Sequence, residues 1–274
     1  MKARNLILLL LLTGFSGAVC AQSGKKIYQK GAVLQGYTLV WSDEFDYKGM
    51  PDSAAWGYEK ERLRKKEVQS YTAANPANVS VQKGLLTITA RMDSSGTSGI
   101  TSANVSTFGK MAFRPGCRIE IAAKIPRGAG AWPSIRLIGA DHSETGWPKC
   151  GEMVVMENTS DEPAVVRSSV HTEGSVHSYD PEVVLSSGLR VSQVWDDFHV
   201  FAVEWEENEI RFFLDHLAYF TYPRPKYKNY WHFSKPFFLT IGLAVGGTSD
   251  EGADSVLPLE FQVDYVRYYR KKDE

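Results

Sequence analysis

The sequence predicts an all-β fold made of two packed antiparallel sheets. Roughly a dozen short segments carry the period-two alternation or the β-branched and aromatic content of strands. Clusters of Gly, Pro, Ser and Asp separate these segments, and no long stretch has helical periodicity. Many short strands with turn signals between them are typical of a sandwich.

The individual strands follow from local patterns. Residues 118–125 place Ile119, Ile121, Ala123 and Ile125 on one face. Further strands are expected at residues 79–81, 85–90, 198–205, 210–214, 217–222, 236–245 and 259–269. Lys83-Gly84 and Asp215-His216 each join two of them, which predicts two hairpins.

The first residues have the order of a secretory signal peptide. Lys2 and Arg4 precede an apolar run over residues 6–12, and Val19-Cys20-Ala21 fits a cleavage site. The run is shorter than the roughly 20 residues that a membrane span needs. We therefore expect a signal peptide at 1–21, cleaved near Ala21, and a secreted or periplasmic product.

The alternative is a lipoprotein anchored through Cys20, against which the bulky Val19 argues. After the leader, residues 22–36 form a polar lead-in and residues 37–271 a single sandwich domain. We see no internal repeat and no second domain boundary in this span.

The charge balance limits the classes of partner. The chain has 31 Lys and Arg against 32 Asp and Glu, so it lacks the basic excess of a nucleic-acid binder. A neutral polysaccharide suits this balance, and no later segment is apolar enough for a transmembrane helix. We expect a monomer without a nucleic-acid partner. Cys117 and Cys150 follow the leader, and their spacing leaves open whether they pair.

Two glutamates on an apolar strand are the strongest chemical signal. Glu152 and Glu157 flank the apolar residues 153–156. Residues five apart point to opposite faces of a regular strand, but a one-residue bulge returns them to the same face. Retaining glycosidases use two carboxyl groups about 5–5.5 Å apart, one as nucleophile and one as acid/base. Two solvent-facing carboxylates remain the alternative for this pattern taken alone.

Several segments resemble glycoside hydrolase family 16, particularly its laminarinase-like members. The carboxylate strand is similar to the family's bulged E-x-D-x-x-E motif. The other similar segments, in the family's chain order, are residues 40–45, 130–135, 147–152, 171–173, 197–205, 243–247 and 263–267. Together they extend over nearly all of the chain after the leader.

The resemblance implies a β-jelly roll with a concave sugar-binding cleft. It assigns Glu152 as nucleophile and Glu157 as acid/base. His171 is a candidate for a hydrogen bond near the reacting centre, and a histidine satisfied within the core is the alternative. Trp132, Trp147 and Trp231 are expected to line the cleft, although each could instead pack in the core. The implied activity is endo-hydrolysis of a β-1,3- or mixed-linkage glucan, without a cofactor for catalysis.

The resemblance also implies a structural calcium ion away from the cleft. The Asp264 side chain and the carbonyl groups of Glu44 and Gly84 are the expected ligands, since oxygen suits this hard cation. Alternatively, Asp264 pairs locally. A charge run over residues 59–67 is interpreted as a solvated surface segment, and Glu67 at its end is a candidate for substrate contact.

Four residues depart from the family pattern in cleft-facing segments. Val154 replaces the motif's aspartate, Arg136 a tryptophan, Asn104 an arginine and Gly242 an asparagine. Arg136 and Asn104 are further candidates for contact with substrate. The cleft is therefore altered, and either the substrate or the rate has changed.

Three classes of protein are compatible with these departures. A retaining glycosidase is favoured because both glutamates are present, and a non-catalytic carbohydrate-binding protein or a scaffold are the alternatives. Since valine cannot hydrogen-bond Glu152, the sequence predicts slow hydrolysis that Val154→Asp would accelerate. The opposing hypothesis is that neighbours such as Arg136 are rebuilt around the valine, so that an added aspartate lowers the rate.

Overall fold

The computed structural model describes residues 34–61, 66–93, 99–173, 185–226, 231–246 and 257–272. The expected signal peptide, most of the lead-in and residues 62–65 of the charge run lie outside these ranges. The first strand begins at Tyr37 and the last ends at Lys271.

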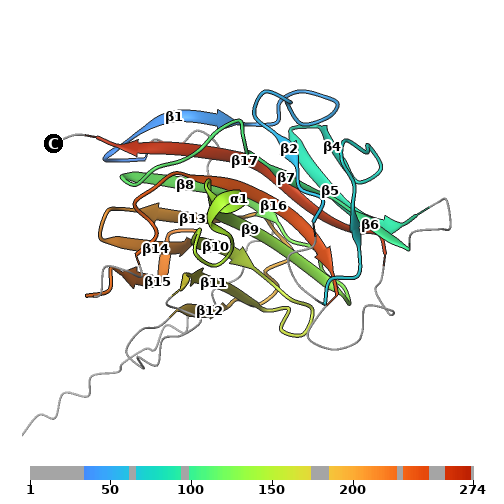
Figure 1. The fold of residues 1–274 in the computed structure, drawn as a ribbon. Coiled ribbons are helices and arrows are strands. Elements are labelled where there is room, and N and C mark those ends of the chain that lie inside the picture. Colours follow the sequence, from blue (N-terminus) through green and yellow to red (C-terminus); the bar gives the residue numbers. More distant parts are fainter. Residues whose placement is uncertain are drawn as a thin grey trace, which may run out of the picture.

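The described chain forms two sheets, as the sequence predicts (Figure 1). The larger one has ten strands, with the order β15-β14-β13-β8-β17-β5-β6-β3, while β1 pairs with β17 and β4 with β5. Its strands are β1 (Tyr37–Asp43), β3 (Ser70–Tyr71), β4 (Val79–Gln82), β5 (Leu85–Met92), β6 (Ile100–Ser102), β8 (Cys117–Lys124), β13 (His199–Trp205), β14 (Glu209–Leu214), β15 (Leu217–Pro223) and β17 (Leu259–Lys271). All pairs are antiparallel except β3 with β6.

The second sheet carries the candidate site. It has seven strands in the order β12-β11-β10-β9-β16-β7-β2, all paired antiparallel. Its strands are β2 (Gly57–Tyr58), β7 (Asn104–Ser106), β9 (Ala131–Gly139), β10 (Glu152–Glu157), β11 (Val165–His171), β12 (Ser186–Arg190) and β16 (Phe237–Val245).

One hydrophobic core fills the space between the two sheets. Ile119, Ile121 and Ala123 of β8 belong to it, which confirms the face predicted from their alternation. Aromatic side chains supply much of its volume: the rings of Trp205 and Phe237 are fully buried and meet edge to face at 5.1 Å. Burial of one such side chain contributes about 1.5–3 kcal/mol, so the core fixes the seven-stranded sheet firmly on the larger one.

Both predicted hairpins are present. The turn between β4 and β5 holds Lys83 at φ 55° and Gly84 at φ 74°. Two successive positive φ values are the geometry of a type I′ turn, which favours glycine. Asp215, with φ 56°, turns the chain from β14 to β15.

Helix is nearly absent from the described residues. The helix α1 (His142–Thr145) has four residues and lies in the connection from β9 to β10. Across the described ranges, no helix is long and apolar enough to cross a membrane. The connection from β9 to β10 is important because it carries Trp147 to the end of the carboxylate strand.

Candidate active site

A β-bulge in β10 brings the two glutamates to one face. The pairing of β10 with β9 skips one residue: Val154 lies opposite Arg136, and Met156 lies opposite Ile135. Val155 and Met156 are therefore both buried in the core, although they are adjacent in sequence. The extra residue reverses the alternation, and Glu157 returns to the face that carries Glu152. The predicted bulge is confirmed.

Strand register arranges the site in rows across the sheet. His171 on β11 lies opposite Glu152, which lies opposite Ile138 on β9. In the next row Val154 lies between Ser169 and Arg136. In a third row, Arg167, Glu157, Ser134, Gly242 and Asn104 follow one another from β11 to β7.

One arginine connects both glutamates. The Nη1 atom of Arg136 donates to Oε1 of Glu152 at 3.0 Å, and Nη2 donates to Oε2 of Glu157 at 3.1 Å. Arg136 is 5% exposed and Glu152 is 4% exposed. Removal of one partner from a buried ion pair costs about 3–5 kcal/mol because the other charge stays buried. The guanidinium therefore compensates the charge of the buried Glu152 carboxylate and also hydrogen-bonds Glu157.

The second oxygen of Glu152 has a different partner. Nε1 of Trp147 donates to Oε2 of Glu152 at 3.0 Å. The Trp147 side chain is 61% exposed, and its ring centroid lies 6.0 Å from that of His171. His171 in turn lies 3.0 Å through Nε2 from Oγ of Ser169. Since Trp147 is anchored to Glu152 yet open to solvent, it forms a wall beside the carboxylate.

These residues surround a cavity of about 590 Å³ on the seven-stranded sheet. Of the candidates from sequence, Glu152, Glu157, His171, Trp132, Trp147 and Arg136 line it. The structure also places Ile138, His142, Cys150, Val154, Arg167, Ser169 and Ser186 in its wall. A pocket of this size, in which polar and charged groups converge beside aromatic rings, is large enough to bind a ligand.

Some lining residues were not predicted from the sequence. Arg167 and Ser169 precede His171 by four and two residues on β11, so they share its face. The alternation along this strand is the signal that could have found them. His142 comes from the connection between β9 and β10, where no strand pattern exists to place it.

Asn104 is not among the residues that line the cavity, and it is packed against another departure from the family pattern. An ideal Cβ on Gly242 would lie 2.9 Å from Cγ of Asn104, its register partner. The asparagine side chain therefore occupies the space that a larger residue 242 would need. The four departures thus form two contacting pairs, Asn104 with Gly242 and Arg136 with Val154.

Two other candidates lie away from the cavity wall. Trp231 is buried in the core cluster, where it stacks on Tyr222 at 5.9 Å, so core packing accounts for its position. Glu67 is 2% exposed and accepts a hydrogen bond from Nε2 of Gln69 at 3.0 Å. The interpretation of the charge run as solvated is therefore wrong at its last residue, because Glu67 packs beside Gly246.

Both described cysteines are free thiols. Cys150 lines the cavity, and burial raises its pKa to about 11. Burial likewise raises the pKa of Cys117 to about 12. Because a thiol with such a pKa is protonated at neutral pH, Cys150 is not a competing nucleophile.

The carboxylate of Glu44 is paired, although the expected calcium ligand is its carbonyl group. Arg267 donates through Nε and Nη2 to the two carboxylate oxygens of Glu44, at 2.8 and 2.9 Å. An ideal Cβ on Gly84 would lie 3.5 Å from Oδ1 of Asp46, and Asp264 is buried in the bulge of β17. Among the described residues no three His, Cys, Asp or Glu side chains gather as a metal site. A calcium ion here would depend mainly on backbone carbonyl groups, and the site stays a prediction.

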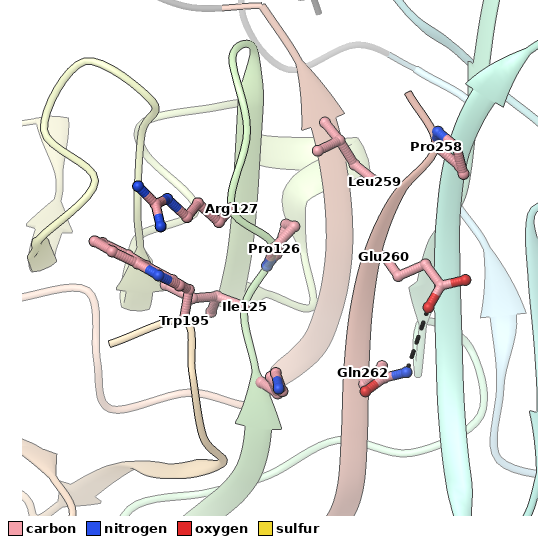
Figure 2. Close-up of a pocket in the computed structure, with 9 residues that line it drawn as sticks. Ile125, Pro126, Arg127, Trp195, Pro258, Leu259, Glu260 and Gln262 are labelled. Carbon is pink, nitrogen blue, oxygen red and sulfur yellow. Dashed lines mark hydrogen bonds between the residues drawn. The ribbon is translucent and has the colours of Figure 1, made fainter. Parts of the chain in front are cut away.

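A second hollow of about 390 Å³ lies where β8 ends and β17 begins (Figure 2). The guanidinium of Arg127 covers the ring of Trp195 at 4.7 Å. Glu260 is the one carboxylate that lines this hollow, and it accepts a hydrogen bond from Nε2 of Gln262 at 3.4 Å. A single carboxylate does not provide the pair that glycoside hydrolysis needs.

The fold and the site define the class of protein. Two packed sheets with a pair of carboxyl groups on one face of a bulged strand are the arrangement of a glycosidase built on a jelly-roll sandwich. The sequence profile described as "Glycosyl hydrolases family 16" matches residues 66–267. The chain belongs to glycoside hydrolase family 16.

Known relatives agree with this assignment. The chain is 38% identical over 248 residues to a beta-glucanase of Rhodothermus marinus, covering 85% of each. It is 32% identical to a keratan-sulfate endo-1,4-beta-galactosidase of Sphingobacterium multivorum, with 85% of this chain and 55% of that enzyme aligned. The crystal structure of the laminarinase from Rhodothermus marinus superposes with a TM-score of 0.75 at 36% identity, covering 86% of this chain and 98% of that one. The chain is therefore a glycosidase.

Proposed function

We propose that this protein is an endo-acting β-glucanase that cleaves β-1,3- or mixed-linkage glucan with retention of anomeric configuration. The observation that carries the proposal is the bulge of β10, which gives Glu152 and Glu157 a common face. The names of the relatives that act on β-glucans support the substrate class.

The mechanism assigns one role to each carboxyl group. The Glu152 carboxylate attacks the anomeric carbon while the glycosidic C–O bond breaks, and Glu157 gives its proton to the departing oxygen. In the second step Glu157 takes a proton from water, the resulting hydroxide attacks the anomeric carbon, and Glu152 is released. Trp147 must move from Oε2 of Glu152 if that oxygen is the one that attacks, and its exposure leaves it free to do so.

A panel of polysaccharides tests the substrate and the stereochemistry. The parent protein is incubated with β-1,3-glucan, mixed-linkage glucan, β-1,4-glucan and red-algal galactan, and the released reducing ends are measured. We expect short oligosaccharides from the first two, with the β-anomer appearing first in the proton NMR spectrum. First appearance of the α-anomer would contradict a retaining mechanism.

A carbohydrate-binding protein without activity is the second candidate. Both oxygens of Glu152 accept hydrogen bonds, and Val154 takes the place of a residue that could orient the nucleophile. Binding of an oligosaccharide without release of products on the whole panel would favour this candidate.

We also propose a structural calcium ion held by the Asp264 side chain and the carbonyl groups of Glu44 and Gly84. A ligand that binds only the folded protein stabilises it by an amount that rises with the logarithm of the free ligand concentration once this exceeds Kd. Excess calcium should therefore raise the melting temperature above that in chelator, and Asp264→Asn should reduce this difference. Equal melting temperatures with calcium and chelator would exclude the site.

Export by cleavage near Ala21 remains a proposal. Mass spectrometry of protein purified from the producing cells distinguishes a chain that begins at Gln22 from one that begins at a lipid-modified Cys20.

A further inference from the structure

We propose that Arg136 is a positioning residue for both catalytic carboxylates, and that it takes over the orienting role of the acidic side chain that Val154 replaces. This proposal rests on the proposed function, because it concerns how the same two glutamates are held. The site is thus rebuilt around a cation, and the valine is part of a working arrangement.

The contacts of Arg136 carry the argument. Its two terminal nitrogens each hold one oxygen of a different glutamate, at 3.0 and 3.1 Å. A guanidinium is planar and keeps its donors in a fixed fork, so two bonds to two carboxylates restrict the relative placement of both. No acceptor among the described residues is within hydrogen-bonding distance of the buried Nε of Arg136. The described hydrogen bonds of this guanidinium are therefore those to the two glutamates, which hold it from two of its three nitrogens.

Val154 is compatible with this arrangement because of its register. It lies directly opposite Arg136 across the β9–β10 pair and is 3% exposed. A carboxylate at this position would be a third acceptor beside the same guanidinium, in competition with Glu152 and Glu157. The valine has no acceptor, so both terminal nitrogens remain on the catalytic pair.

Arg136 contacts both groups whose charge changes during the first step of the reaction. In the first step Glu152 loses its negative charge as its bond to the sugar forms, while Glu157 gains one as it releases its proton. Arg136 contacts both groups, so the charge moves between two acceptors of one guanidinium. Preorganised charge of this kind stabilises a transition state because it needs no rearrangement during the reaction.

Substitution of Arg136 tests the proposal by a split between turnover and binding. In Arg136→Met, kcat on β-1,3-glucan should fall about 10²-fold, whereas KM should change far less because the sugar contacts stay. Arg136→Lys should recover only a small part of the loss, since a single ammonium cannot form the fork.

Arg118→Met is the matched control. Arg118 is also buried and also contacts two glutamates, Glu120 at 2.7 Å and Glu204 at 3.0 Å, but it lies on the ten-stranded sheet. This variant should have a lower melting temperature than the parent and the same kcat. If the loss of any buried ion pair were enough to lower kcat, both Arg118→Met and Arg136→Met would be slower than the parent.

Two further measurements exclude a merely structural role. Guanidinium chloride at low millimolar concentration should restore part of kcat to Arg136→Ala, whereas the same concentration of sodium chloride should not. Val154→Asp should lower kcat, because the new carboxylate draws the guanidinium from the pair. Parental kcat in Arg136→Met, or a rate increase in Val154→Asp, would overturn the proposal.

A thermal double-variant cycle keeps this inference separate from the proposed function. Melting temperatures are compared for Arg136→Met, Glu157→Gln and the double variant. We expect the double variant to lose less than the two single losses combined, whether or not the parent has turnover. Additive losses would overturn the bridging role, whereas undiminished turnover in Glu152→Gln and Glu157→Gln would overturn the proposed function instead.

Discussion

Glu152→Gln and Glu157→Gln should each abolish most hydrolysis of the preferred β-glucan, with kcat about 10²–10⁴-fold below the parent for the acid/base variant. The loss for Glu152→Gln should be at least as large, because an amide cannot form the covalent intermediate. Initial rates on the polymer provide the measurement. Glu120→Gln, which changes a carboxylate of similar burial on the other sheet, should keep the parental rate.

Substrates with different leaving groups distinguish the roles of the two glutamates. An aryl β-glucoside with an acidic phenol needs little protonation to depart, so Glu157→Gln should recover much of its first-step rate on this substrate. Glu152→Gln should stay inactive on both substrates because it lacks the nucleophile. If both variants turned over the polymer at nearly the parental rate, Glu152 and Glu157 would not be the catalytic pair.

Gly139→Ala should cause a large loss of stability. An ideal Cβ on Gly139 would lie 2.0 Å from the carbonyl oxygen of Cys150 and 2.9 Å from its carbonyl carbon. Both atoms belong to the backbone, so the chain must shift. We expect about 3 kcal/mol lower free energy of unfolding and a melting temperature lower by roughly 6–12 °C. Turnover should also fall, since Cys150 is two residues from Glu152.

Gly57→Ala is the control for this effect. On Gly57 of β2 the nearest atom to an ideal Cβ is Cε of Lys110 at 3.5 Å, an ordinary contact. Calorimetry should therefore show a change near zero for this variant. Equal melting temperatures for the two variants would mean that the backbone at Cys150 can shift without lowering the free energy of unfolding.

The sequence was sufficient for the features that depend on local alternation. The core face of β8 and the two hairpins each follow from a few neighbouring residues, whereas the bulge of β10 was expected from the resemblance to the family's bulged motif. The contacts of Arg136 could not be predicted in the same way. They depend on which residue of β9 lies opposite Val154, and this register is set by the whole sheet.

Long-range packing also determines where the three candidate tryptophan side chains lie. Trp132 and Trp147 line the cavity, whereas Trp231 stacks in the core on Tyr222. All three have the same side chain, and no local pattern distinguishes a ring that lines the cavity from one that packs between strands. The pairing of Asn104 with Gly242 was hidden for the same reason, since 138 residues separate the two positions.

The position of β17 has a consequence for the order of folding. This strand is the last along the described chain, yet it lies inside the ten-stranded sheet between β8 and β5, and β1 pairs with it as well (Figure 1). The sheet therefore cannot close until the final strand has been synthesised. Pairing across such sequence distances is slow and leaves strand edges exposed in the meantime. The nascent chain should thus remain protease-sensitive on the ribosome until β17 emerges, and stalled chains that end before residue 259 should not acquire protection.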